Sequence, residues 1–120
     1  MSVEVISTDR FRTEIFDYPM QKEFMFASET PIVLNFFATW CGPCRAFAPV
    51  LDQVADEYTD RIRIYKIDID KDPEVAALFG VMSIPTTVFF KSNRRPAMAM
   101  GNLGKEGLRR AISDHLGVNL

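Results

Sequence analysis

The sequence has few of the residues that build metal centres, disulfide scaffolds or haem sites. Its 120 residues include two cysteines and one histidine. A structural zinc ion takes about four cysteine or histidine ligands, and small secreted scaffolds need several disulfides. Attachment of c-type haem requires a histidine directly after the second cysteine, and Arg45 stands there instead. Two cysteines that fit none of these classes are candidates for redox chemistry, and no metal is expected.

Long apolar runs and a strong charge of either sign are also missing. The apolar runs fall far short of the roughly 20 residues of a membrane helix, so we expect no contact with a membrane. The formal net charge is −2, which gives no overall attraction to nucleic acid. Residues 1–12 do not have the pattern of a signal peptide. The cytoplasm is therefore the expected compartment, although a leader removed before residue 1 would leave no trace.

What is present indicates one globular domain. Hydrophobic residues make up 48 % of the chain and charged residues 25 %, which is ordinary for a folded protein. A chain of this length can bury one core. The sequence contains no repeat, low-complexity block or linker. We therefore expect residues 1–120 to form a single domain, and we expect a monomer.

Hydrophobic patterns predict strands that alternate with helices. Strands are expected at residues 3–7, 32–38, 61–69, 86–90 and 96–101. Helices are expected at residues 9–17, 43–58, 72–80 and 105–116, and residues 18–30 have no regular pattern. The order β-α-β-α-β-α-β-β-α is typical of an α/β fold, with a mostly parallel sheet between two layers of helices. The last two strands follow each other closely and should form an antiparallel hairpin.

Individual residues mark the ends of these helices. Ser7 or Thr8 can cap the first helix, and Asp72 can cap the third. Gly80 is placed to end the third helix. Pro49 lies inside the second helix, where it removes a backbone hydrogen bond and should produce a kink.

Cys41 and Cys44 stand where a predicted strand meets a predicted helix. The free N–H groups and partial positive charge of a helix N-terminus favour a thiolate, and the Cys44 thiol can donate a hydrogen bond to Cys41. These effects lower the pKa of the Cys41 thiol from the ordinary value of about 8.5, and the turn should keep it accessible. Cys41 can then attack a partner's disulfide, and Cys44 can attack Cys41 to release the reduced partner.

The two residues between the cysteines suit this exchange. Gly42 lets a partner backbone approach, and Pro43 stiffens the turn. A purely structural disulfide remains an alternative, but it would close a very short loop and constrain little of the unfolded chain. A C-x-x-C pair at a strand-to-helix junction of an α/β chain favours the redox interpretation.

The motif WCGPC at residues 40–44 resembles the active site of the thioredoxin family. The segment SIPT at 83–86 resembles the second conserved motif of that family, and Pro49, Lys66 and Gly101 also stand at family positions. The likeness is close from about residue 31 to the end and loose before it. It implies a thioredoxin fold, which is a central five-stranded mixed sheet flanked by four helices, and the order of elements above agrees.

This resemblance implies a thiol–disulfide oxidoreductase that reduces protein disulfides and acts as an electron carrier in cell redox homeostasis. It implies that Cys41 is the nucleophile, that Cys44 is the resolving thiol, and that Pro85 is cis. It implies no cofactor beyond the redox-active disulfide, with electrons from a thioredoxin reductase, and disulfide-containing client proteins as partners. Clients would pair with the peptide before the proline, in a groove lined by Trp40, Gly42, Pro43, Ile84, Pro85 and the backbone near Gly101.

Asn35 departs from the family pattern. Members usually carry a buried aspartate there, near the lysine that Lys66 matches, and it takes the proton from the resolving thiol. A carboxamide does not titrate in this range, so Asn35 cannot act as that base. One interpretation is a hydrogen-bonded core amide, paired for example with Lys66. The other is altered kinetics, in which the deprotonation of Cys44 is slower and has a different pH profile.

Two other functions stay open on the sequence alone. One is a dedicated oxidant or isomerase in an oxidising compartment, which a measured reduction potential would identify. The other is a thioredoxin-like protein with specialised clients or a mainly partner-binding role, which uses its cysteines little or not at all and which Cys41→Ser would distinguish. The Gly42-Pro43 dipeptide between the cysteines is the form found in thioredoxins and favours the reductase.

Overall fold

The computed structural model describes residues 3–18, 26 and 28–120, and these form five strands and four helices. The strands are β1 (Glu4–Val5), β2 (Ile32–Phe37), β3 (Arg63–Asp68), β4 (Thr86–Phe90) and β5 (Ala97–Met100). The helices are α1 (Thr8–Glu14), α2 (Gly42–Glu57), α3 (Pro73–Leu78) and α4 (Gly104–Leu116). Every predicted element is present in the predicted order. The first strand and the first helix are shorter than predicted, and most of the segment expected to be irregular lies outside the described residues.

The five strands form one mixed sheet in the order β1-β3-β2-β4-β5. The β1–β3 and β2–β3 pairs are parallel, whereas the β2–β4 and β4–β5 pairs are antiparallel. The prediction of a mostly parallel sheet was therefore wrong for β4, although the hairpin of the last two strands was right. The six residues of α3 span only about 9 Å, too little to carry the chain back along the sheet. As a result β4 starts beside the end of β2, with Thr86 opposite Phe36.

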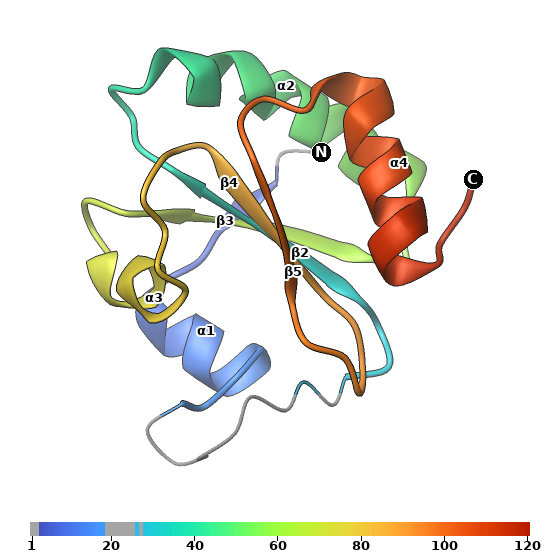
Figure 1. Ribbon diagram of the computed structural model, residues 1–120, viewed down its shortest axis with the longest axis horizontal. Coiled ribbons are helices and arrows are strands. Elements are labelled where there is room, and N and C mark those ends of the chain that lie inside the picture. The colour runs from blue at the N-terminus through green and yellow to red at the C-terminus, as the bar shows by residue number, and fades with distance from the viewer. Residues whose placement is uncertain (1–2, 19–25, 27) are drawn as a thin grey trace.

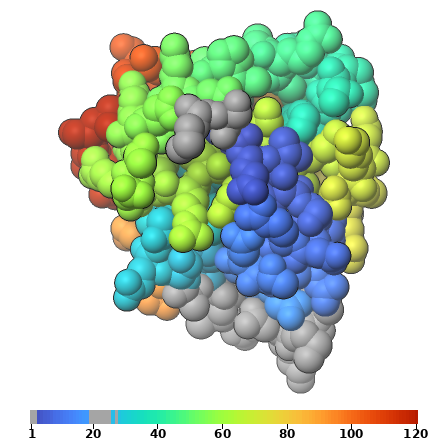
Figure 2. Space-filling model, turned by 180° about the vertical axis from the view of Figure 1, so that it is seen from behind, coloured from blue at the N-terminus to red at the C-terminus, as the bar shows by residue number. Residues whose placement is uncertain are grey.

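The helices cover the sheet in two layers, with α2 and α4 on one face and α1 and α3 on the other (Figure 1). Successive residues of β2 alternate between these layers, as the pleat of a strand requires. Val33 packs in the core that includes Phe47, Leu51, Leu108 and Ile112 of α2 and α4. The next residue, Leu34, packs in the core that includes Phe11, Phe16, Val75 and Phe90. Figure 2 shows the molecule from behind, where α1 (blue) lies beside α3 (yellow).

The ends of the helices agree with the predicted caps and stops, with one difference at Asp72. The Ser7 hydroxyl accepts the N–H of Arg10 at 3.2 Å and caps α1, and Gly80 follows the end of α3 with a φ of +63°. Asp72 occupies the cap position of α3, but its carboxylate makes no cap hydrogen bond. It accepts the N–H of Thr8 at 2.9 Å instead and so joins the starts of α1 and α3. The α2 helix continues through Pro49.

Within the part of the chain that the structure describes, no helix combines the length and the apolarity that crossing a membrane requires.

Candidate active site

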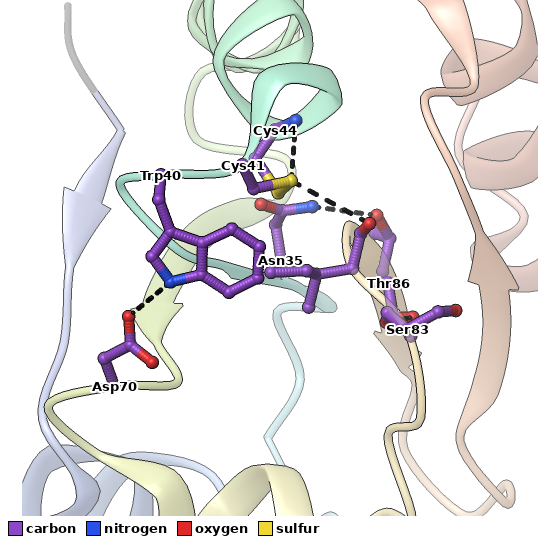
Figure 3. Close-up of a disulfide and its surroundings, with 9 residues drawn as sticks. Asn35, Trp40, Cys41, Cys44, Asp70, Ser83 and Thr86 are labelled. Carbon is purple, nitrogen blue, oxygen red and sulfur yellow. Dashed lines mark hydrogen bonds between the residues drawn. A yellow bond between two sulfur atoms is a disulfide. The ribbon is translucent and has the colours of Figure 1, made fainter.

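Cys41 and Cys44 form a disulfide at the N-terminus of α2, with their Cα atoms 5.3 Å apart. Cys41 is the N-cap residue of this helix, and its Sγ accepts the backbone N–H of Cys44 at 3.2 Å. The same sulfur lies 3.9 Å from the carbonyl oxygen of Ile84, in the loop before β4 (Figure 3). A backbone N–H that has no partner within the helix thus donates to the Cys41 sulfur. This arrangement favours a thiolate.

Both cysteines are buried in this oxidised form. Each is 5 % exposed and packs in a small cluster with Ala38, Phe37, Ile69 and Ile84. The expectation that the turn keeps Cys41 accessible was therefore wrong for the disulfide, because the neighbouring strand ends and the Ile84 loop enclose the turn. Cys44 is buried for a second reason: it starts the stripe of α2 that continues with Phe47, Leu51 and Val54. Between the two cysteines, Gly42 and Pro43 are exposed.

Trp40 stands at the surface beside the disulfide, where it is 66 % exposed. Its indole N–H donates a hydrogen bond of 2.8 Å to the carboxylate of Asp70, just after β3 (Figure 3). An indole N–H that finds a partner holds the ring in one orientation while its apolar face stays available. Sequence reasoning placed Trp40 at this edge but missed Asp70, because nothing in the chain marks which acidic residue will reach the indole.

The loop before β4 forms the opposite side of the site. The Ile84–Pro85 peptide bond is cis, as the resemblance implied, and the carbonyl oxygen of Pro85 accepts the N–H of Gly101 at 2.7 Å. Gly101 has a φ of +89°, a backbone conformation that glycine adopts without a steric penalty. Of the residues predicted to line the client groove, only Trp40 and Ile84 line the groove described next. A role in client binding for Gly42, Pro43, Pro85 and Gly101 stays a prediction.

Between Trp40 and this loop lies a groove of about 350 Å³, lined by Trp40, Ile69, Ala76, Val81, Met82, Ser83 and Ile84. Met82 is 94 % exposed, and Met100 on the neighbouring strand β5 is exposed as well. Sequence reasoning did not select Met82, although its position directly before the SIPT segment was available as a signal. Exposed, flexible methionines suit a surface that receives varied apolar side chains.

Asn35 lies in the middle of β2, on the face covered by α2. It is 2 % exposed, and its register partners are Lys66 on β3 and Thr87 on β4. Its side-chain nitrogen donates a hydrogen bond of 3.2 Å to the Thr87 hydroxyl, as the dashed line from Asn35 in Figure 3 shows. Asn35 is thus a buried, hydrogen-bonded amide, with Thr87 and not Lys66 as its partner, and the alternative of altered kinetics stays a prediction.

Lys66 does not form the predicted pair because its side chain extends past Asn35 along the strand. Its Nζ lies 4.7 Å from the centre of the Phe37 ring, a cation–π contact that brings it toward the carboxyl end of β2. Sequence reasoning missed Thr87 as a partner, because the contact depends on the register that sets Thr87 of β4 opposite Asn35 of β2. The three residues form a polar row across the sheet that contains an amide, an ammonium group and a hydroxyl.

Among the described residues, no group of three or more histidine, cysteine, aspartate or glutamate side chains could hold a metal ion. His115 belongs to α4, and the centre of its ring lies 5.3 Å from the centre of the Phe89 ring.

Comparison with known proteins gives one consistent family. The thioredoxin family profile matches residues 3–114. A thioredoxin of Borreliella burgdorferi is 32 % identical over 117 residues, which cover 98 % of this chain and 99 % of that protein. The chloroplastic M-type thioredoxin of Spinacia oleracea is 41 % identical over 95 residues, which cover 79 % of this chain. The matched residues span only 52 % of the length of that plant protein.

Solved structures agree with the sequence relatives. The crystal structure of a chloroplastic thioredoxin z superposes with a TM-score of 0.80 at 27 % identity and covers 98 % of this chain and 97 % of that one. The match therefore extends over the sheet, all four described helices and the disulfide-bearing turn. The chain belongs to the thioredoxin family of thiol–disulfide oxidoreductases.

Proposed function

We propose that this oxidoreductase works as a reductase of protein disulfides, with Cys41 as the attacking thiolate and Cys44 as the resolving thiol. The observation that carries this assignment is the unequal placement of the two sulfurs. Cys41 caps α2 and accepts a backbone N–H at its N-terminus, beside the exposed Trp40 and the exposed Gly42-Pro43 turn. Cys44 is as buried as Cys41 in the disulfide, so the assignment rests on the backbone N–H that Cys41 accepts, which favours Cys41 as the thiolate.

The exchange has two steps. The Cys41 thiolate attacks one sulfur of the client disulfide, so that a Cys41–client bond forms and the second client sulfur leaves as a thiolate that takes up a proton. Cys44 then loses its proton and attacks the Sγ of Cys41. The Cys41–Cys44 bond forms, the first client sulfur leaves, and two electrons have passed from the protein to the client.

The client groove supports protein substrates rather than small thiols. It is apolar and wide, and it lies between Trp40 and the loop of Ile84 and Pro85. We propose that an extended client segment lies along this loop and pairs with its backbone. Exposed Met82 and Trp40 would contact the side chains that flank the client disulfide.

The test is reduction of a protein disulfide, followed by insulin precipitation with dithiothreitol as the electron source. Cys41→Ser should abolish the activity, because it removes the attacking sulfur. Cys44→Ser should instead trap the client as a mixed disulfide that is visible on a non-reducing gel. Full activity of Cys41→Ser, or trapping through Cys44 in that variant, would overturn the assignment.

We further propose a thioredoxin reductase as the electron donor, with no bound cofactor, and a reducing compartment such as the cytoplasm. Family membership supports a reductase partner, and the bacterial relative supports the compartment, whereas the plant relatives are chloroplastic. A coupled assay with a thioredoxin reductase and NADPH tests the donor directly. We propose that residues 1–120 act as a single-domain monomer, which light scattering of the purified protein can test.

A further inference from the structure

A second pocket lies on the other side of the disulfide from the client groove. It has a volume of about 230 Å³ and is lined by Phe37, Ala38, Thr39, Cys44, Arg45, Ala48 and Lys66. Thr39 and Arg45 are exposed, so solvent enters this pocket and reaches the resolving cysteine without passing through the groove. A water molecule takes about 30 Å³ in the liquid, so the pocket holds several waters or one small ion.

The charged groups that line this pocket are both cations. Lys66 lines it and holds its Nζ 4.7 Å from the centre of the ring of Phe37, another lining residue. Arg45 lines it from the first turn of α2. Within the described part of the chain, neither side chain forms an ion pair or a side-chain hydrogen bond, and the Thr39 hydroxyl has no partner there either. Two cations and a free hydroxyl around one cavity supply the donors that an oxyanion requires.

Asn35 explains why a ligand there would matter. The carboxamide is held by Thr87 and cannot take a proton from Cys44, yet resolution requires the Cys44 thiolate. No carboxylate is among the described residues that line the pocket. The pocket therefore gives a base that enters from solvent a path to the proton of Cys44.

We propose that this pocket binds a small dianionic oxyanion of the hydrogen phosphate class between Lys66 and Arg45, and that the bound ion is the base that deprotonates Cys44. The inference rests on the proposed role of Cys44 as the resolving thiol. A base is most effective when its conjugate acid ionises near the working pH. Phosphate monoesters ionise for the second time near pH 6, and dihydrogen phosphate, a weaker acid, does so closer to neutral pH. The ion is a diffusible substitute for the carboxylate that position 35 lacks.

The chemistry balances without any further reactant. Hydrogen phosphate takes the proton of Cys44 and becomes dihydrogen phosphate. The Cys44 thiolate attacks the Sγ of Cys41, the Cys41–Cys44 bond forms, and the Cys41–client bond breaks. The client sulfur leaves as a thiolate and can take the proton back from dihydrogen phosphate, which regenerates the base. The electron pair that forms the new disulfide comes from Cys44, and the client sulfur carries away the pair of the broken bond.

The experiment measures the decay of the mixed disulfide in the presence of inorganic phosphate. The reduced protein is mixed with a disulfide peptide at pH 7, quenched with acid at successive times, and analysed by mass spectrometry. Ionic strength is held constant with sodium chloride. Sulfate is the matched control ion, because it has the same shape and charge but is not protonated near neutral pH. We expect phosphate to accelerate the decay several-fold and to saturate, and sulfate to compete with phosphate without accelerating it.

Variants connect the effect to the pocket. Lys66→Gln should remove the saturable acceleration of the decay by phosphate. Arg94→Gln removes the same charge from the turn between β4 and β5 and should leave the response to phosphate unchanged. Asn35→Asp should make the decay independent of phosphate, because it restores an internal carboxylate. Circular dichroism of each variant checks that it is folded.

The possible outcomes are distinct. Equal effects of phosphate and sulfate, or an undiminished phosphate response in Lys66→Gln, would overturn the oxyanion site while the reductase function stands. Failure of the wild type to form the mixed disulfide through Cys41 would overturn the proposed function itself.

Discussion

Replacing Asn35 by aspartate should make the stability of this protein depend on pH. The side chain is 2 % exposed, and burial raises the pKa of a carboxyl above its ordinary value of about 3.9. Fully buried carboxyls are raised by as much as 3–5 pH units. Lys66 and Thr87 stand on either side of position 35 in the sheet, and both can stabilise the carboxylate. They offset part of the effect of burial, so we take a rise in the pKa of about 3 pH units. One pH unit corresponds to about 1.4 kcal/mol, which gives a penalty of about 4 kcal/mol.

The sign follows from the two states of the new carboxyl. Its pKa is higher in the folded than in the unfolded protein, so the folded state holds the proton more tightly. The variant therefore comes closest to the wild type below about pH 4, where both states are protonated. As the pH rises from about 4 to about 7, its free energy of unfolding should fall by about 1.4 kcal/mol per pH unit relative to wild type, and then level off.

Urea unfolding of the oxidised proteins between pH 4 and pH 9 measures this difference. Asn102→Asp is the matched control, because Asn102 is exposed and its side-chain oxygen accepts the N–H of Gly104, a role that a carboxylate can keep. The control should show no loss of stability as the pH rises. A difference between Asn35→Asp and wild type that stays constant with pH would refute the reasoning, since it would mean that the site does not disfavour a charge.

The same substitution tests the kinetic role of position 35. Ionisation of the new carboxyl supplies the missing base, so the resolution of the mixed disulfide in Asn35→Asp should accelerate as the pH rises through the carboxyl's pKa. Wild type has no such group in this place, and its rate should follow the ionisation of Cys44 instead. Identical pH profiles for the two proteins would sink this hypothesis.

Three further predictions concern the groups around the site and the helix layer above it. Thr87→Val should lower the free energy of unfolding by about 1–3 kcal/mol in urea, because the buried amide of Asn35 loses its acceptor. Met82→Ser should lower kcat/KM for insulin reduction several-fold and leave the urea midpoint unchanged, since Met82 is exposed. Arg109 lowers the pKa of Glu57, so Arg109→Gln should destabilise the protein most at neutral pH, with the loss shrinking as the pH falls below the ordinary carboxyl value of 4.5.

Each of these has its own control. The double variant Asn35→Leu with Thr87→Val removes both polar groups and should be more stable than the sum of the two single losses of stability would give. Losses that simply add would contradict the hydrogen bond between the two residues. Met98→Ser changes an exposed methionine outside the groove and should not affect kcat/KM. For Arg109, an equal loss at pH 3 and pH 7 would show that the ion pair between α2 and α4 is not its source.

Much of this fold is predictable because its local signals agree with each other. The β-branched run of β2 and the apolar stripe of α2 identify their elements, and Gly80 ends α3 where predicted. The motif at residues 40–44 places the two cysteines together through their spacing alone. Such features depend on residues close in the chain, where propensity and spacing carry the information.

The features that escaped prediction depend on the register between distant segments. The hydrogen bond from Asn35 to Thr87 spans 52 positions and depends on the register that sets these residues opposite each other. The partner of Trp40, Asp70, is one of several acidic residues near the end of β3. The burial of Cys41 depends on the loop of Ile84, which is distant in the chain but packs against the turn. None of these distances is encoded in local spacing.

The position of Cys44 at the start of the buried stripe of α2 links the redox couple to the stability of the whole domain. Reduction breaks a bond at the top of the helix that packs Phe47, Leu51 and Val54 against the sheet. A change in this packing that affects the oxidised and reduced forms unequally must move the reduction potential, by about 30 mV for each 1.4 kcal/mol of difference. Substitutions deep in the core, remote from any client, are therefore a means of tuning how strongly this protein reduces its partners.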